Sequence, residues 1–381
     1  MTPITADSPP RLLLLDVEEL LALRRRVYDG DPDLQRADEQ LLENAEQATQ
    51  AGPFSVAHKK RMPPSGDVHD YLSEAPYWWP DPDSTDGLPY VRRDGEINPE
   101  REDRDPSELA GLMAAVSTLS LGYFYTEQER FADHAARLLR TWFLDPATSM
   151  NPHLEFGQAI PGRAEGRAEG IIETRQLCQL PDASGLLEAS SSWSDEDDGQ
   201  LRAWCAEFAS WLNTSRHGLG ECERTDNHGT WYDAQVIALS LFVGDDDTAA
   251  EAVKRLPRRI QAQIAEDGSQ PQELARTRSL DYCLMNLTGL LDLTELCARC
   301  GPMFDALVSE VRPGMAAAVA WLVDNAVDSE WIHPQITEID RRQLIPLLTR
   351  GSHLLGDPSL RERASRLDAD AAADRSHLLY A

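Results

Sequence analysis

The chain has 381 residues, with 36 lysines and arginines against 65 aspartates and glutamates, so its formal net charge is −29. This acidity excludes broad binding to nucleic acid or to an anionic membrane, because both partners require a cationic footprint. Hydrophobic residues make up 41% of the chain, enough for a large core and unlike a disordered protein.

The sequence shows few signs of export, membrane insertion or metal binding. Met1 to Pro10 lacks the basic start, apolar stretch and cleavage site of a secretory signal, so we expect a cytoplasmic protein, or a periplasmic or secreted one if the sequence has been trimmed. No run approaches the ~18 consecutive apolar residues of a membrane span. Cys297 and Cys300 form a CxxC pair, but they end an apolar helical run and no second pair follows, so they predict core thiols rather than a metal site.

In chain order, eleven segments repeat apolar residues at three- and four-residue steps, the pattern of an amphipathic helix. They are Val17–Tyr28, Asp33–Ala48, Glu108–Tyr125, Glu127–Phe143, Gly170–Leu180, Asp195–Leu212, Thr230–Leu241, Thr248–Gln263, Ser279–Ala298, Pro302–Asn325 and Arg341–Leu355. Alternating β-branched runs of comparable length do not recur, so the sequence predicts an all-α protein. Many helices without a tight repeat favour a closed ring of helical hairpins over a regular solenoid.

Between these helices, residues from about 52 to 105 form a long irregular stretch rich in proline, glycine and aromatic side chains. It contains Lys60, Tyr71, Tyr77, Trp78 and Trp79, and it is too aromatic for a solvated linker, so we expect it to be ordered. Tyrosine and tryptophan pack against sugar rings, and lysine or arginine beside them suits acidic groups. The stretch therefore indicates a site for acidic saccharides, with an aromatic seal over the helices as the alternative.

A second irregular stretch, from about 146 to 170, contains Gln158 and a tandem Gly-Arg-Ala-Glu that includes Arg167. Closely spaced glycines let a backbone and its arginines approach a ligand. A phosphate loop would need Gly-Lys-Ser/Thr, which is missing here. The alternative is a low-complexity surface turn.

The string from Asp226 to Gln235 combines polar and aromatic residues at the start of a predicted helix. Thr225 or Asp226 can cap this helix, which places Asn227 and His228 near its first turn. The positive end of the helix dipole disfavours an imidazolium ion, so we expect a neutral His228 that can accept a proton. A buried structural histidine is the alternative.

The string from Glu273 to Tyr282 contains two arginines near a tyrosine. In a continuous helix, Arg278, Tyr282 and Asn286 would share one face, and Arg276 would point elsewhere. If the helix begins only near Ser279, Arg276 lies in the preceding loop and can bend toward the tyrosine. Geometry alone leaves both arginines open, and a pair of surface arginines beside an interfacial tyrosine is the alternative.

Taken together, these strings resemble the alginate lyase family of polysaccharide lyases, most closely its branch called polysaccharide lyase family 38. The matching pieces lie in consistent order: Ser65-Gly66-Asp67, His69-Asp70-Tyr71, Tyr77 to Pro82, Gly87 to Tyr90, Asn98-Pro99-Glu100, Gly166-Arg167, Gly170 to Glu173, Asn227 to Tyr232, and Arg276-Thr277 with Ser279-Leu280 and Tyr282. The resemblance implies a single (α/α) toroid domain over residues 1–381, with a groove that cleaves a β-1,4-linked uronic acid polymer by β-elimination. It implies no metal and no other cofactor.

By this similarity, Asn227, His228, Arg276 and Tyr282 fall on the catalytic positions. Elimination removes the C5 proton beside a carboxylate, and asparagine and arginine suit the neutralisation of that charge. Tyr282, with a pKa lowered by the adjacent arginine, would act as base, as acid toward the leaving O4, or as both, and His228 would be the partner base or position the sugar. The implied substrate-binding residues are Lys60, Tyr71, Tyr77, Trp78, Trp79, Gln158, Arg167, Trp231 and Arg278.

One tyrosine that serves as both base and acid suits sugars whose C5 proton and O4 lie on the same side. We therefore expect a mannuronate polymer or oligosaccharide, with glucuronan admitted by the resemblance, bound to a monomer or a weak homodimer. Val68 stands where the family usually has lysine, and Ala168-Glu169 replaces a less acidic pair, so the sugar contacts at these positions differ from the family pattern.

Two other classes of protein are compatible with the same residues. A glycoside hydrolase needs two carboxylates about 5–10 Å apart, and Asp70, Glu173 and Glu273 are candidates. A non-catalytic saccharide-binding protein would use the aromatic residues and leave the catalytic positions idle. Whichever class is right, an acidic saccharide requires a cationic groove on the acidic body of the protein. Such a groove can bind a polyanion because charges farther away than ~8 Å are heavily screened.

Overall fold

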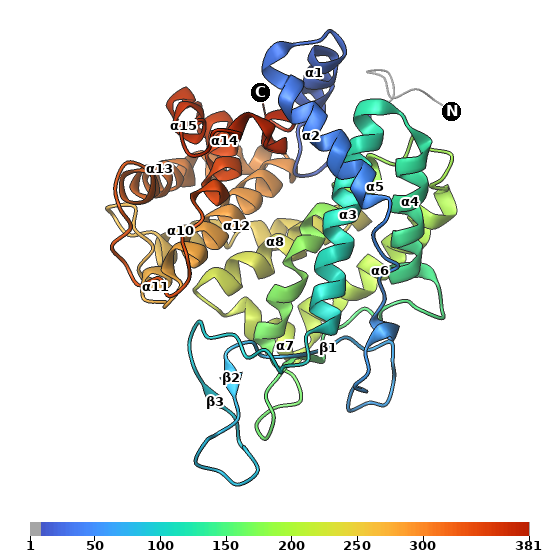
Figure 1. Ribbon diagram of the computed structural model, residues 1–381, viewed down its shortest axis with the longest axis vertical. Coiled ribbons are helices and arrows are strands. Elements are labelled where there is room, and N and C mark those ends of the chain that lie inside the picture. Colours follow the sequence, from blue (N-terminus) through green and yellow to red (C-terminus); the bar gives the residue numbers. More distant parts are fainter. Residues whose placement is uncertain (1–8, 381) are drawn as a thin grey trace.

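The computed structural model of the protein describes residues 9–380, so most of the segment on which the expectation about export rests lies outside the described residues. Helices dominate this part of the chain (Figure 1). The α-helices are α1 (Val17–Tyr28), α2 (Pro32–Ala48), α3 (Arg104–Thr126), α4 (Glu129–Leu139), α5 (Leu180–Gly185), α6 (Asp195–Thr214), α7 (Arg216–Cys222), α8 (Asn227–Val243), α9 (Asp246–Val253), α10 (Leu256–Gln263), α11 (Pro271–Leu274), α12 (Ser279–Arg299), α13 (Asp305–Leu322), α14 (Leu344–Leu355) and α15 (Pro358–Ala364).

All eleven predicted helical segments are helical in the structure. The segment predicted at 248–263 consists of two helices, because Pro257 lacks a backbone N–H and suits only the first turn of a new helix, α10. The segment predicted at 170–180 is a 3-10 helix, η3 (Ala168–Gln179). The short helices α5, α7, α11 and α15 were not predicted, because none exceeds seven residues and the apolar pattern cannot repeat in so few.

The long helices pack into a ring. In chain order, α2 packs on α3, α3 on α4 and η3, η3 and α6 on α8, α8 on α12, and α12 on α13 and α14. The C-terminal 3-10 helix η8 (Arg375–Leu378) contacts both α14 and α2 and so closes the ring. The predicted ring of helical hairpins is therefore confirmed.

Helix α8 is buried along almost its whole length, and its buried polar residues, such as Asp233 and Gln235, are paired inside the protein. The carboxylate of Asp226 accepts a hydrogen bond from the backbone N–H of His228 and caps the helix at its N-terminus. Gly244, with a φ of 82°, ends it in the left-handed conformation. These two caps fix the first turn of α8 at the end of the ring that carries the long loops.

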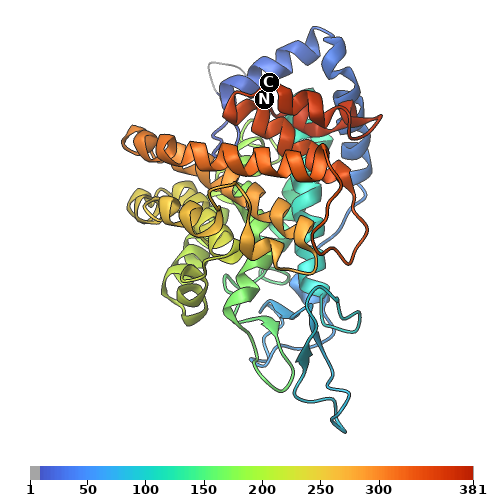
Figure 2. The ribbon, with the colours of Figure 1, turned by 90° about the vertical axis from the view of Figure 1, so that its left-hand side faces the viewer.

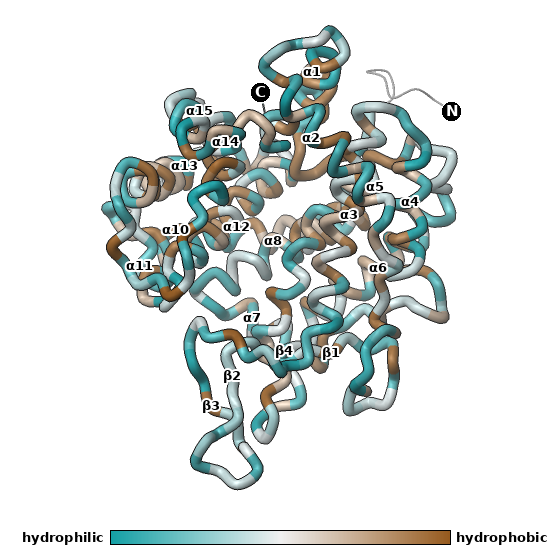
Figure 3. The backbone as a smooth tube through the Cα atoms, viewed as in Figure 1, coloured by the Kyte–Doolittle hydropathy of each residue, from teal (hydrophilic) through white to brown (hydrophobic). Residues whose placement is uncertain are grey.

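The two irregular stretches contain the strands. Strand β1 (Leu72–Glu74) pairs in parallel with β4 (Phe156–Ala159), and β2 (Trp78–Trp79) pairs antiparallel with β3 (Val91–Arg92). They lie at one end of the molecule, opposite α1, α14 and α15 (Figure 2). The long loops around β2 and β3 are mostly hydrophilic (Figure 3). The stretch from about 52 to 105 thus has a defined conformation, as expected from its aromatic residues.

Two helical segments, Arg104–Thr126 and Pro302–Val327, are long and apolar enough by composition to cross a membrane. Both belong to the ring, where α3 packs against α2 and α4, and α13 packs against α10, α12 and α14. Core helices of globular proteins share this composition. Of the CxxC pair, Cys297 is fully buried in the core and Cys300 is half-buried, and both are free thiols.

Candidate active site

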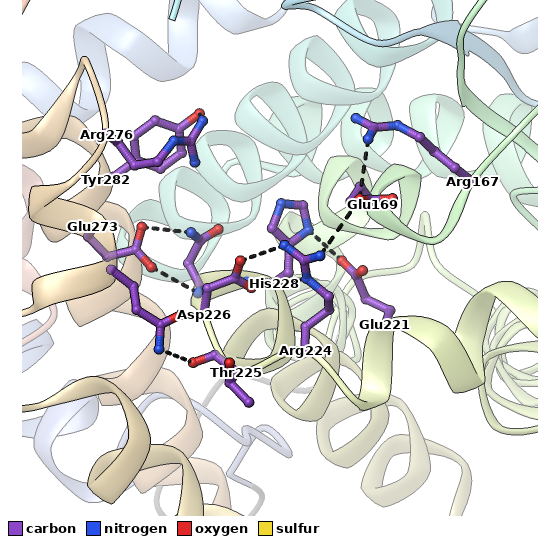
Figure 4. Close-up of polar contacts among 12 residues, drawn as sticks. Arg167, Glu169, Glu221, Arg224, Thr225, Asp226, His228, Glu273, Arg276 and Tyr282 are labelled. Atoms are coloured by element: carbon purple, nitrogen blue, oxygen red, sulfur yellow. Dashed lines mark hydrogen bonds and ion pairs between the residues drawn. The ribbon is translucent and has the colours of Figure 1, made fainter. Parts of the chain in front are cut away.

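A cavity of about 580 Å³ lies where the loops around the strands meet the first turns of α8 and α12. Four stretches that are distant in the sequence form its wall. The lining residues are Pro76, Tyr77, Trp78, Arg92, Gln158, Arg167, Glu169, Ile172, Glu173, Arg175, Arg224, Asp226, His228, Arg276, Arg278, Asp281, Tyr282 and Met285. The structure therefore brings together the strings that the sequence singled out. Figure 4 shows His228 between Arg276 with Tyr282 on one side and Arg167 with Glu169 on the other.

The start of α12 decides between the two arginines. The helix begins at Ser279, so Arg276 lies in the loop before it and bends toward Tyr282. Its Nη2 donates a hydrogen bond of 2.8 Å to the Tyr282 hydroxyl, and its guanidinium lies 3.8 Å from the centre of the tyrosine ring. Arg278 also lines the cavity, but it pairs with Asp281 at 2.7 Å. The alternative of a continuous helix is wrong.

The hydroxyl of Tyr282, which accepts the hydrogen bond from Arg276, donates its own proton in a hydrogen bond of 2.7 Å to the hydroxyl of Tyr77. Burial and the neighbouring Tyr77 raise the pKa of Tyr282 far above its usual value, and the positive charge of Arg276 only partly opposes them. The expectation of a lowered pKa is therefore wrong, because desolvation of the phenolate outweighs its attraction to one arginine. At neutral pH Tyr282 is a neutral phenol.

Asp94, which follows β3, was not predicted as a site residue. Its carboxylate accepts hydrogen bonds from Nε and Nη2 of Arg276 and from the backbone N–H of Thr277. Burial alone would raise the pKa of Asp94, but the hydrogen bonds from Arg276 and Thr277 outweigh it and lower this pKa to about 2. The sequence marks Asp94 only as part of a charged string and does not indicate its partner.

His228 lies in the first turn of α8, with its Nδ1 2.6 Å from Oε1 of Glu221 in α7. Burial lowers the pKa of His228, but the buried carboxylate of Glu221 outweighs it, and the net effect is to raise this pKa above 6.5. The expected neutral imidazole is therefore wrong at weakly acidic pH. The contact with the Glu221 carboxylate affects the pKa of His228 more than the helix dipole does. Helix α7, which carries Glu221, is too short to be predicted from periodicity.

Asn227 lies behind the cavity wall. It is 1% exposed, and it is not one of the lining residues. Its Nδ2 donates to Oε2 of Glu273 at 2.8 Å and its backbone N–H to Oε1 at 3.0 Å. Its Oδ1 has no hydrogen-bond partner within residues 9–380. Asn227 thus connects the start of α8 to α11, directly beside His228.

A buried carboxyl group closes the cavity on the side of the strands. Tyr71 and Ser73 both donate hydrogen bonds to Oε2 of Glu173, at 3.0 and 2.6 Å, and burial raises the pKa of Glu173 to about 7. Gln158 and Arg167 line the cavity beside it, and Arg167 donates to Oε1 of Gln158. Tyr71 was predicted to bind substrate. Its side chain is fully buried, however, and instead supports Glu173.

Three further predicted substrate-binding residues do not line the cavity. Trp231 is 6% exposed and packs in the core against α12, one helical turn deeper than His228. Lys60 is exposed to solvent. Its neighbour Lys59 is the lysine that points inward, where it pairs with the buried carboxylate of Asp105. Trp79 donates its indole N–H to the carbonyl of Glu96 and supports the loop after β3. The structure places these three residues outside the cavity lining, whereas Tyr77, Trp78, Gln158, Arg167 and Arg278 are lining residues.

The charge of the wall is positive. Six arginines line the cavity, against four carboxylic acids, one of which is Glu173 with its raised pKa. Arginines thus outnumber carboxylic acids in the wall, as a cationic groove on an acidic body requires. Of the three carboxylates proposed for a hydrolase, only Glu173 lines the cavity. Asp70 instead accepts from Ser65 and Asn151, and Glu273 from Asn227.

Comparison with known proteins agrees with this arrangement. The chain matches the sequence model of the family described as alginate lyase over residues 55–332. It is 34% identical to an alginate lyase from Bacteroides ovatus whose crystal structure is known, covering 98% of this chain and 99% of that one with a TM-score of 0.89. Alginate lyase A1-III from Sphingomonas species A1 shares the fold at 16% identity, covering 95% of this chain and 94% of that one with a TM-score of 0.55.

A structure of alginate lyase A1-III in complex with a tetrasaccharide matches with a TM-score of 0.56, at 16% identity and with the same coverage of 95% and 94%. A search of curated protein sequences finds no significant match. The helical fold is thus an (α/α) toroid of the type that polysaccharide lyases use. The chain belongs to the alginate lyase family.

Proposed function

We propose that this protein cleaves a β-1,4-linked uronic acid polymer or oligosaccharide by β-elimination, and that it belongs to the branch called polysaccharide lyase family 38. Its preferred substrate is mannuronan or the mannuronate part of alginate, with glucuronan as the second candidate. The observation that carries the proposal is the Arg276–Tyr282 hydrogen bond of 2.8 Å inside a cavity with an excess of arginine.

The first requirement of the reaction is to neutralise the carboxylate beside the C5 proton. Removal of this proton leaves an enolate whose charge must be stabilised as it develops. Arg276 is suited to this task because it lines the cavity and has donors to spare. Asn227 is buried behind the wall and bound to Glu273, so it is proposed to support the start of α8 beside His228 rather than to contact the carboxylate.

The second requirement is to move protons at C5 and O4. As a neutral phenol, Tyr282 can donate its proton to the leaving O4. To accept the C5 proton, Tyr282 must first release its own proton to solvent, as a phenolate stabilised by Arg276. The proton that it then takes from C5 is the one it passes to the leaving O4. A single group for both transfers requires the two atoms on the same side of the sugar, which favours mannuronate.

His228 has a different task in this proposal. Its pKa is raised by Glu221, so it holds a proton more readily than an ordinary histidine. A protonated imidazole is a poor base, but it binds an acidic sugar well. We therefore assign His228 to the positioning of the uronate, together with Arg167 and Gln158, which also line the cavity.

One assay tests the proposal. The enzyme is incubated with alginate, mannuronate blocks, glucuronan and hyaluronan, and the ultraviolet absorbance of the unsaturated product is followed. We expect the highest rate on mannuronate blocks. New reducing ends without absorbance would indicate a glycoside hydrolase, and binding without any product would indicate a non-catalytic saccharide-binding protein; either result refutes the proposal.

A further inference from the structure

The loop after β3 makes a dense set of contacts with the catalytic side of the cavity. Oδ1 of Asp94 accepts hydrogen bonds from Nη2 of Arg276 at 2.7 Å and from Nε at 3.1 Å, and Oδ2 accepts from Nε at 3.2 Å. Oδ2 also accepts from the backbone N–H and the hydroxyl of Thr277, at 3.2 and 3.1 Å. Arg92, which lines the cavity, donates to Oδ1 at 2.6 Å. One carboxylate therefore contacts both of these arginines.

These contacts divide the donors of Arg276 into two groups. Nε and Nη2 face Asp94, and Nη2 also donates to the hydroxyl of Tyr282. Nη1 has no hydrogen-bond partner in the part of the chain that the structure describes, although Arg276 lines the cavity. A carboxylate that grips one edge of a planar guanidinium fixes the direction of the other edge. In Arg276 the other edge carries Nη1, whose N–H groups remain available to a ligand.

The loop that carries Asp94 is itself closely fitted to its support. Gly95 has a φ of +75°, and a Cβ atom on it would lie 2.2 Å from the hydroxyl oxygen of Thr277. The same hydroxyl donates to the backbone carbonyl of Asp94 at 2.8 Å. Only glycine permits so close an approach with this backbone conformation. The main chain of Asp94 is thus held by the hydroxyl of Thr277, on the same short connection that carries Arg276.

We propose that Asp94 is a positioning residue for the elimination. It holds Arg276 so that Nη2 stays on the Tyr282 hydroxyl while Nη1 faces the carboxylate of the uronate. The inference rests on the proposed function. Arginine has a long side chain with many rotamers, and a misplacement of about 1 Å in a catalytic group costs on the order of 10²-fold in rate. Asp94 removes that freedom before the substrate arrives.

The test is a double-mutant cycle measured in single-turnover assays, with enzyme in excess so that very slow variants can be read. Asp94→Ala should lower the elimination rate about 10²-fold, while Asp83→Ala, in the exposed loop between β2 and β3, should leave it unchanged. In an Arg276→Ala background, Asp94→Ala should cost nothing further. A carboxylate that only fastened the loop would cost the same factor in both backgrounds, and that result would overturn the inference.

Two controls make the outcome decisive. If Asp94→Ala does not fold, Asp94→Asn keeps the shape of the side chain without its charge, and its rate loss should also vanish in the Arg276→Ala background. A wild-type protein that forms no unsaturated product from any uronate polymer refutes the proposed function itself. A wild-type protein that is active, together with an Asp94→Ala variant of equal rate, overturns only the role of Asp94.

Discussion

Replacement of Tyr282 by phenylalanine removes one oxygen atom from the centre of the site. The ring remains, so the contact of 3.8 Å with the Arg276 guanidinium persists, and the hydrogen bonds of 2.8 and 2.7 Å with Arg276 and Tyr77 are lost. General acid or base catalysis by one group contributes about 10²–10⁴-fold in rate. Because Tyr282 is assigned to both proton transfers, we expect a loss of at least about 10⁴-fold, equivalent to roughly 5 kcal/mol of activation free energy.

The same change should have only a modest effect on folding and on binding. Two lost hydrogen bonds correspond to about 2 kcal/mol of unfolding free energy, and less if water replaces them. The assay is the absorbance of unsaturated product, with polymer binding measured by calorimetry. Tyr232→Phe is the matched control, because it removes a buried hydroxyl that donates to the carbonyl of Leu212. A Tyr282→Phe enzyme that keeps more than about a tenth of the wild-type rate would contradict the acid–base assignment.

The remaining predictions concern charge and packing. Arg276→Ala should lower the elimination rate by orders of magnitude and Arg278→Ala by less, because Arg278 is held by Asp281 rather than by the tyrosine; the reverse ranking in the product assay would contradict this. Glu221→Gln should lower the pKa of His228, as read by NMR titration, because burial is then opposed only by the weaker attraction of Asp226. In the wild type the raised pKa makes the protonation of His228 stabilising below pH 6.5, and this contribution is lost as the pH rises through the raised value. Urea unfolding of the wild type should therefore show a loss of stability with rising pH that is weakened or reversed in Glu221→Gln. Trp231→Leu should lower the unfolding free energy by about 2–4 kcal/mol in urea titrations and leave KM unchanged, since Trp231 is core.

The long helices could be predicted because their apolar spacing repeats over several turns, and every predicted segment is helical. Short elements carry no such signal, and one of them has a chemical consequence. Helix α7 has seven residues, and it supplies the Glu221 carboxylate that contacts His228. Without α7, the only visible influence on His228 was the helix dipole, which acts in the opposite direction. The protonation state of this histidine therefore could not be predicted from its own neighbours in the sequence.

The residues of the site were predicted better than their contacts. Arg276 and Tyr282 are six positions apart, so the point at which α12 begins decides whether they meet. Asp94 is 182 positions from Arg276, and no local pattern indicates that pair. Trp231 failed for another reason. It follows His228 by three residues on a helix whose first turn borders the cavity, so its ring lies one turn deeper, in the core.

The acidic composition and the proposed polyanionic substrate are reconciled by how the arginines are held. Five of the six lining arginines already have a carboxylate partner: Arg92 and Arg276 share Asp94, and Arg278 pairs with Asp281, Arg224 with Asp226, and Arg167 with Glu169. These pairs orient the arginines, but each carboxylate also offsets positive charge. The net positive charge of the cavity is therefore small. Glu173 offsets little of it, because a carboxyl group with a pKa of about 7 is largely uncharged below neutral pH. A short uronate segment can therefore bind locally, while charges on the acidic body farther away than ~8 Å are screened.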